Sequence, residues 1–307
     1  MGRRKKGNPV HGWVILDKPI GMTSTQAVGK VRWLFQAQKA GHAGTLDPLA
    51  TGVLPIALGE ATKTVPFAVD GLKAYQFTVR WGTETDTDDA EGRPVRTSDK
   101  RPTAAEIEAI LPRFRGEIQQ TPPQYSAIKV DGNRAYDLAR EGEVVQLEPR
   151  PVVIDRLDMV EMVDESTSVF EAECGRGTYV RALARDMGRL LGCFGHVIEL
   201  RRTEVAAFHE DRSVTIEELE AAYAAEDGGV AIKGYLQPIE LALSGLIEVS
   251  VTPSDASRLA RGQTVLMRGR DAPIQSGEAY AISKGTLIAL CHMEKGELVP
   301  IRVFSYA

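Results

Sequence analysis

One aspartate lies in a setting that suits catalysis. Asp47 falls in a segment with three glycines and a proline, Gly41 to Gly52, which has neither helical nor strand periodicity. Glycines let the main chain approach a ligand closely, and Pro48 biases Asp47 towards extended conformations. A carboxylate on such a loop can act as a nucleophile or a base. The alternative is an Asx turn, in which Asp47 only bonds its own backbone.

Two further side chains could take part in the same chemistry. Tyr75 opens a stretch of alternating apolar and polar residues, typical of a half-buried strand, and could reach a site or belong to the core. Arg181 lies near the start of an apolar-patterned helix after Gly177. It could pair with a carboxylate, or it could share a solvated basic face with Arg185 and Arg189.

The elements that must position these residues are strands and helices in mixed order. Trp13 to Leu16 and Val53 to Leu58 are apolar strand candidates, and Ser24 or Thr25 is expected to cap the helix between them. Capping boxes predict two more helices, which begin after Thr103 and Thr215, and the acidic stretch 82–92 is expected to be a polar connection. The order lacks a strict βαβ rhythm. We therefore expect the α+β class, with a mixed β-sheet flanked by helices.

Changes in composition and in predicted secondary structure along the chain suggest three parts. Residues 1–10 form a basic flexible arm, 11–245 the main domain and 246–307 a compact domain of short β-prone pieces. Within the main domain, residues 124–151 are predicted to form an insertion that leaves the main fold, with a turn sequence typical of a β-hairpin at Asp131-Gly132.

Charge neither requires nor excludes a nucleic-acid partner. The chain has 37 basic and 42 acidic residues and a formal charge of −5, whereas nucleic-acid binders often carry a basic excess. Affinity for phosphate depends on local clusters, however. Basic residues gather at 3–6, 30–39 and 176–202, and acidic residues gather at 84–91, 155–173 and 217–226. This segregation permits RNA binding.

Cysteine and histidine usage favours a reducing compartment, so we expect a cytoplasmic protein. The three cysteines lie far apart and are expected to be small buried residues. The five histidines are equally scattered, so no metal and no cofactor are expected. No apolar run reaches the roughly 20 residues that cross a bilayer, and no membrane partner is expected.

The segment around Asp47 resembles a known family. The block Gly44-Thr-Leu-Asp-Pro-Leu-Ala-Thr-Gly-Val-Leu-Pro55 is similar to the catalytic segment of the TruB family of tRNA pseudouridine synthases. Other family segments follow in the same order: Asp17-Lys18-Pro19-x-Gly21, Lys73-Ala-Tyr75, Pro122-Pro-x-Tyr125-Ser-Ala-x-Lys129, Gly177-Thr-Tyr179-x-Arg181 and Leu200-Arg-Arg202. The resemblance covers Gly12 to Thr203 and, more loosely, the C-terminal tail.

This resemblance implies an isomerase that converts uridine 55 in the T loop of tRNA to pseudouridine. Asp47 would be the essential carboxylate, by a chemical path that the sequence does not decide. Tyr75 would stack on the uracil, and its hydroxyl is a candidate for taking the C5 proton. Arg181 would hold Asp47 ionised and oriented.

The resemblance also implies substrate contacts. A uridine in a structured loop must be flipped out of its stack before it can react. His42 would fill the vacated stack, although a lone loop histidine otherwise suggests a structural role. Other expected contacts are Tyr179, the apolar wall Leu200, Lys18, which shapes or lines the pocket, and Lys129 on a thumb formed by the 124–151 excursion, where it would meet phosphates.

Two other functions fit the same residues. The chain could be the catalytic subunit of a guide-dependent box H/ACA-type particle, although the full 124–151 insertion favours a stand-alone enzyme. It could also be a tRNA-binding or tRNA-folding protein that keeps the pocket. The C-terminal part resembles a PUA-type RNA-binding barrel. We expect a monomer with no obligatory protein partner, because the substrate is large and no coiled-coil seam is present.

Overall fold

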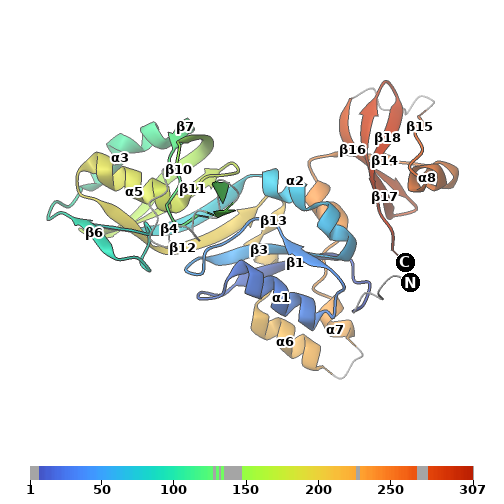
Figure 1. The fold of residues 1–307 in the computed structure, drawn as a ribbon, viewed down its shortest axis with the longest axis horizontal. Helices are drawn as coiled ribbons and strands as arrows, with labels where there is room; N and C mark the ends of the chain where they lie inside the picture. The colour runs from blue at the N-terminus through green and yellow to red at the C-terminus, as the bar shows by residue number, and fades with distance from the viewer. Residues whose placement is uncertain are drawn as a thin grey trace.

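The structure is a computed structural model. It describes residues 7–126, 147–225, 229–267 and 276–306, together with the backbone of 129–130 and 133–134. Two sheets dominate the described chain, one of nine strands and one of five (Figure 1).

The larger sheet has mixed strand order. Its path is β1-β3-β12-β4-β11-β10-β7, with β2 paired to β3 and β13 paired to β12. The β3–β12 ladder is parallel and the others are antiparallel. The strands are β1 (Gly12–Lys18), β2 (Ala40–His42), β3 (Thr51–Leu58), β4 (Lys73–Trp81), β7 (Gly116–Gln120), β10 (Arg150–Asp164), β11 (Thr167–Cys174), β12 (Gly195–Val205) and β13 (Phe208–His209). This mixed sheet with flanking helices confirms the predicted α+β class.

Helices cover the two ends of this sheet. In Figure 1, α1 and α6 lie beside β1 and β3, and α3 and α5 lie beside β10 and β11. The helices are α1 (Ser24–Leu34), α2 (Val65–Asp70), α3 (Ala104–Ile110), α5 (Val180–Leu191), α6 (Ile216–Ala224) and α7 (Val230–Lys233); short 3₁₀ turns are Gly59–Lys63, Leu111–Phe114, Glu210–Arg212 and Ile239–Leu243. A small ribbon of β5 (Thr83–Thr85) and β6 (Pro94–Thr97) forms a separate two-stranded sheet next to β12.

Strand β1 is apolar on both faces because each face meets a different core. Val14 and Leu16 belong to the larger cluster, which also contains apolar side chains of α1 and α5. Trp13 and Ile15 pack on the other side, in a second cluster that includes Phe208. Side chains alternate between the faces of a strand, so a continuous apolar run indicates burial on both.

The smaller sheet comes from the C-terminal part of the chain. Its order is β14-β16-β17-β18-β15, and helix α8 packs against it. The bounds are β14 (Ile247–Ser250), α8 (Pro253–Ala260), β15 (Val265–Leu266), β16 (Gly277–Ser283), β17 (Thr286–Glu294) and β18 (Glu297–Val303). The predicted short β pieces are therefore confirmed as strands of one sheet.

The predicted start of helix α1 is wrong by one residue or more. Thr23 is the N-cap, and it forms a reciprocal capping box with Gln26. Ser24 is buried instead, and its hydroxyl bonds the backbone of Leu46. The capping boxes at Thr103 and Thr215 are confirmed.

Only the two ends of the predicted thumb (124–151) and one short hairpin within it can be described. Strand β8 (Lys129–Val130) pairs with β9 (Asn133–Arg134) in antiparallel register, as expected of a hairpin. The turn residues Asp131 and Gly132, the side chain of Lys129 and residues 135–146 lie outside the described part of the chain.

Candidate active site

The loop that carries Asp47 is fixed by hydrogen bonds from both sides. Ser24 Oγ donates to the Leu46 carbonyl at 3.0 Å and accepts from the Leu46 N–H at 2.8 Å. The Pro48 carbonyl accepts from the N–H of Gly21 at 2.8 Å. These contacts leave the Asp47 side chain on the cavity side, where it is 37% exposed.

Lys18 supports the same loop from behind. It is fully buried, and its ammonium donates to the carbonyls of Pro19 at 2.9 Å, Met22 at 2.7 Å and Pro48 at 3.4 Å. Burial lowers the pKa of Lys18 to about 8, against the opposing effect of the Asp47 charge. Lys18 is not among the residues that line the cavity, so its geometry supports the shaping role and gives no support to substrate contact.

The close approach of β3 and β12 depends on a glycine. Gly52 has φ of +94°, and a Cβ at this position would lie 2.2 Å from the carbonyl oxygen of Arg202. A side chain is therefore excluded by both conformation and space. By contrast, a Cβ on Gly41 would meet nothing within 4 Å, so the expected close approach holds at one end of the loop and not at the other.

A cavity of about 520 Å³ opens where the Asp47 loop, β4, β12 and the start of α5 meet. Six of the eight expected site residues line it: His42, Asp47, Tyr75, Tyr179, Arg181 and Leu200. Sequence reasoning named no site role for other lining residues, notably Lys73, Ser126, Arg176 and Arg202. Three of these missed residues, Lys73, Ser126 and Arg202, belong to the short motifs that carry the resemblance, which was the available signal.

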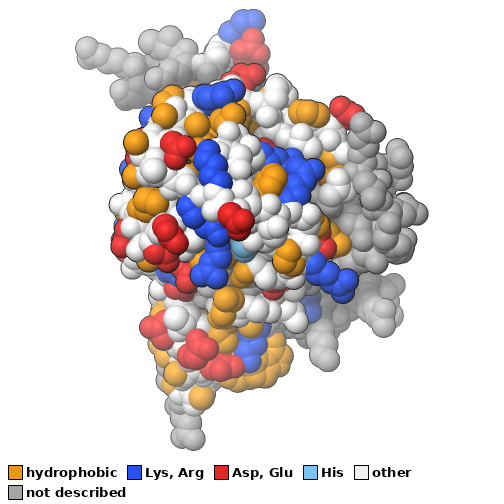
Figure 2. All heavy atoms as spheres, turned by 90° about the vertical axis from the view of Figure 1, so that its left-hand side faces the viewer, with side chains coloured by type: hydrophobic (Ala, Val, Ile, Leu, Met, Phe, Trp, Pro, Cys, Tyr) orange, Lys and Arg blue, Asp and Glu red, His pale blue; other side chains and the backbone are white. Residues whose placement is uncertain are grey.

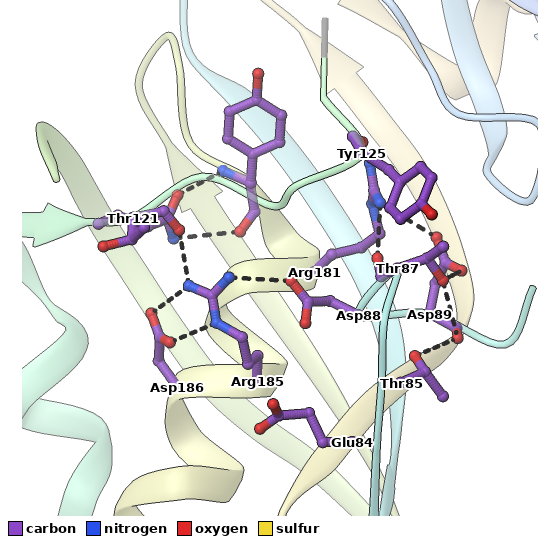
Figure 3. A network of polar contacts seen from close by, with 12 residues as sticks. Glu84, Thr85, Thr87, Asp88, Asp89, Thr121, Tyr125, Arg181, Arg185 and Asp186 are labelled. Carbon is purple, nitrogen blue, oxygen red and sulfur yellow. Dashed lines mark hydrogen bonds and ion pairs between the residues drawn. The ribbon is translucent and has the colours of Figure 1, made fainter. Parts of the chain in front are cut away.

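Arg181 joins the catalytic candidate to two distant segments. Its Nε lies 2.9 Å from Asp47 Oδ2. One Nη donates to the Thr87 carbonyl at 2.8 Å and lies 3.4 Å from Asp89 Oδ2, and the other donates to the Tyr125 carbonyl at 3.0 Å (Figure 3). The side chain is 5% exposed, so the alternative of a solvated basic face is wrong for this residue.

The same alternative is also wrong for Arg185, which is buried one turn further along α5. Arg185 pairs with Asp88 at 3.0 Å and with Asp186 at 2.8 Å, and it donates to the Thr121 carbonyl at 2.7 Å (Figure 3). Arg189 pairs with Glu84 at 2.8 Å but remains 44% exposed. Three arginines at i, i+4 and i+8 thus lie on one side of the helix and meet one acidic segment.

That acidic segment is not the polar connection expected for residues 82–92. Glu84, Asp88 and Asp89 are each at most 5% exposed. Burial raises the pKa of Asp88 to about 6, although the charges of Arg185 and Arg181 oppose the shift. The sequence separates these acids from their arginines by about 95 residues, so their pairing is visible only in the fold.

Tyr75 and Arg202 form the floor of the cavity. Burial raises the pKa of Tyr75, and the positive charge of the Arg202 guanidinium opposes that rise. Tyr75 belongs to β4 and Arg202 to β12, where the two residues are register partners. Tyr75 is therefore a residue of the site as well as of its strand.

His42 ends β2 at the rim of the cavity. Its Nδ1 is buried and has no hydrogen-bond partner among the described residues. Burial, aided by the Arg202 charge, lowers the pKa of His42. Burial therefore favours the neutral form of the ring, a form suited to stacking.

Tyr179 is the N-cap residue of α5, and two hydrogen bonds join its backbone to the Gln120 side chain at the end of β7. Gln120 accepts from its N–H at 2.8 Å and donates to its carbonyl at 3.2 Å. Burial raises the pKa of the Tyr179 phenol. Leu200 is 8% exposed and supplies the apolar wall.

The outer surface carries separate basic clusters. Figure 2 shows Lys and Arg side chains gathered in several patches on one face, with acidic side chains between them.

In the described ranges, no group of three or more His, Cys, Asp or Glu could hold a metal ion. All three cysteines are buried and free, as expected. No described helix is long and apolar enough to cross a membrane.

Comparison with known proteins defines the class. Residues 32–180 match the family model described as TruB family pseudouridylate synthase (N terminal domain), and residues 181–244 match that described as tRNA pseudouridylate synthase B C-terminal domain. In fold, the chain resembles the archaeal box H/ACA sRNP Nop10-Cbf5 complex, with a TM-score of 0.73, 26% identity and coverage of 100% of this chain and 94% of that chain. The fold is that of a pseudouridine synthase.

Curated relatives narrow this class further. The chain is 61% identical to the tRNA pseudouridine synthase B of Rhodopseudomonas palustris, over 98% of this chain and 83% of the relative. It is 54% identical to the protein of that name from Brucella melitensis biotype 1, over 99% of each. The chain belongs to the TruB family.

Proposed function

We propose that this protein is a tRNA pseudouridine synthase that converts uridine 55 of the T loop to pseudouridine. Its relatives bear the corresponding name. The observation that carries the proposal is the Asp47–Arg181 pair at 2.9 Å, in a cavity that also contains Tyr75. The reaction is an isomerisation: the N1–C1′ bond breaks, a C5–C1′ bond forms, C5 loses its proton and N1 gains one.

Asp47 is the group that acts on the nucleotide. Its carboxylate is exposed to the cavity, while Arg181 holds it from the protein side. Arg181 is in turn fixed by the Thr87 and Tyr125 carbonyls, so the carboxylate has a defined direction. A carboxylate placed in this way can attack the ring or the sugar, or assist cleavage of the glycosidic bond.

The other cavity residues handle the detached base. Tyr75 lies under the uracil and takes the C5 proton, and Leu200 supplies an apolar wall. Tyr179 closes the side next to α5. A cavity of about 520 Å³ has the size of small-molecule sites and accommodates one nucleotide.

Entry of the nucleotide requires base flipping. His42 lies at the rim with a buried, unpartnered Nδ1 among the described residues, and it replaces the flipped base in the stack. The 124–151 insertion, with Lys129, clamps the T arm, and the C-terminal sheet adds a PUA-type RNA contact. We further propose that the enzyme acts as a monomer, in the cytoplasm and without metal or cofactor.

Two other functions share these features. A guide-dependent subunit is suggested by the likeness to the Nop10-Cbf5 complex, and a tRNA-folding protein would use the same binding surface. The insertion at 124–151 favours recognition of tRNA without a guide. Activity of the purified chain on a bare transcript separates these possibilities.

The test is tritium release from a tRNA transcript that carries C5-tritiated uridine. Wild-type protein should release tritium from the normal transcript without a guide RNA. Asp47→Asn should bind the transcript and release none, and a transcript with cytidine at position 55 should not react. Binding without release by the wild type would overturn the enzymatic proposal and leave an RNA-binding protein.

A further inference from the structure

Arg202 is buried beneath the cavity, next to a surface arginine of the same strand. Its side chain is 1% exposed, whereas Arg201 points to the opposite face of β12 and pairs with Asp17 and Glu210. Adjacent residues of a strand face opposite sides, so the two arginines have separate environments.

Neutral groups bind the Arg202 guanidinium. Its Nε donates to the Val53 carbonyl at 2.8 Å, and one Nη donates to the Gly44 carbonyl at 3.1 Å. In the part of the chain that the structure describes, no carboxylate oxygen lies within 4.0 Å of it. A buried cation without a counter-ion is costly, and an arginine cannot escape that cost by losing its proton.

The charge is directed at Tyr75. The two residues are register partners on β12 and β4, so their side chains lie on the same face of the sheet, and both line the cavity. The guanidinium charge opposes the burial that raises the pKa of the Tyr75 phenol. Arg202 also donates a hydrogen bond to the Gly44 carbonyl, in the loop three residues before Asp47. One buried cation therefore lies next to Tyr75, the candidate general base, and bonds the loop that carries the Asp47 carboxylate.

We propose that Arg202 is a positioning residue for catalysis, which fixes the Tyr75 hydroxyl at the cavity floor and stabilises the phenolate that takes the C5 proton. This inference rests on the role proposed for Tyr75. A phenol can accept a proton only after losing its own, and burial disfavours the resulting anion. The unpaired guanidinium supplies the compensating positive charge.

The proton transfer balances without another reactant. Once the C5–C1′ bond has formed, C5 carries one hydrogen and the ring has a C6–N1 double bond. The phenolate takes the C5 proton, the C–H electron pair forms the C5–C6 double bond, and the C6–N1 pair moves to N1. N1 then takes a proton from water, so the ring ends as neutral pseudouridine, and the hydroxide left behind combines with the proton that the phenol released to solvent when it ionised.

The test is a double-mutant cycle measured by single-turnover tritium release with excess enzyme. Tyr75→Phe should slow release by roughly 10²- to 10⁴-fold, the usual contribution of a general base. Arg202→Met should slow release by about tenfold or more in the wild-type background and have little further effect in the Tyr75→Phe background. The matched control, Arg201→Met, should leave the rate near that of the wild type.

The pH profile separates a charge effect from a structural one. The wild-type rate should rise with pH as Tyr75 ionises, and in Arg202→Gln this rise should move to higher pH. Arg202→Lys keeps the charge and should keep the position of the rise, even if its rate is lower. Filter binding of the transcript and thermal unfolding show whether each variant is folded.

The outcomes are distinct. If Arg202→Met slows Tyr75→Phe as much as it slows the wild type, or if Arg202→Gln keeps the wild-type profile, Arg202 acts only structurally and the inference is overturned. If Tyr75→Phe retains the wild-type rate, the role of Tyr75 fails and this inference fails with it, while the assignment of Asp47 stands.

Discussion

Ser24 and Leu46 exchange two hydrogen bonds through a single hydroxyl, which ties the first turn of α1 to the residue before Asp47. Ser24→Ala would leave a buried N–H and a buried carbonyl without this partner. We expect it to lower the free energy of unfolding by about 1–3 kcal/mol and to reduce kcat, because the Asp47 loop loses its anchor. Urea unfolding and tritium release measure the two effects. Thr25→Ala, at the exposed next position, is the control, and equal behaviour of the two variants would contradict the anchoring role.

Gly52→Ala should prevent the close packing of β3 on β12. The new Cβ would lie 2.2 Å from the Arg202 carbonyl oxygen at a positive φ, so we expect a loss of roughly 3 kcal/mol or more in stability. Circular dichroism melting is the measurement. Gly41→Ala, in the neighbouring strand β2 but with open space around the new Cβ, should melt near the wild-type temperature. A Gly52→Ala protein as stable as Gly41→Ala would show that the strands can separate freely.

Asp88 makes stability depend on pH in an unusual direction. Its pKa is about 6 in the folded protein and near 3.8 in the unfolded chain, so the folded state binds the proton first. Its contribution to the free energy of unfolding therefore grows as pH falls through 6 and levels off below about 4, by up to about 3 kcal/mol. Asp88→Asn should remove this component. Urea unfolding at pH 5 and pH 7 checks it, and an unchanged pH dependence in Asp88→Asn would refute it.

Arg185→Met should destabilise the protein far more than the loss of an exposed arginine. It leaves Asp88 buried without its cation and frees the Thr121 carbonyl at the root of the thumb. We expect a loss of about 3–5 kcal/mol, or misfolding. Arg176→Met removes a pair with Asp70 that is mostly exposed, and it should cost less than about 1 kcal/mol. Comparable losses in the two variants would mean that burial does not decide the strength of these pairs.

Local patterns predicted elements well and their contacts poorly. Alternation predicted β4 and β11, and apolar periodicity predicted the buried face of α5, because both depend on side-chain direction within one element. The cap of α1 was misplaced because Thr23, Ser24 and Thr25 are all cap formers, and only the fold shows that Ser24 is used elsewhere. The sequence left open a solvated basic face for Arg181, Arg185 and Arg189, because their acidic partners on residues 84–89 lie roughly 90 to 105 residues away.

For the site, too, local motifs were predicted from the sequence and long-range contacts were not. The motif around Asp47 identified the carboxylate, and a pair with Arg181 was expected from the resemblance. Arg202 and Lys73 belonged to the quoted motifs, yet nothing in their spacing revealed that they line the cavity. Their placement depends on the parallel approach of β12 to β3 and on the β12–β4 register, which are long-range pairings.

The second hydrophobic cluster joins the two sheets into one folding unit. Trp13 and Phe208 from the larger sheet share it with Leu287, Leu290 and Phe304 from the C-terminal sheet. Truncation of the chain before β14 would strip cover from this cluster and leave the larger sheet prone to self-association. The two sheets should accordingly unfold together in a calorimeter, as a single endotherm. The C-terminal sheet thus completes the hydrophobic core of the larger sheet.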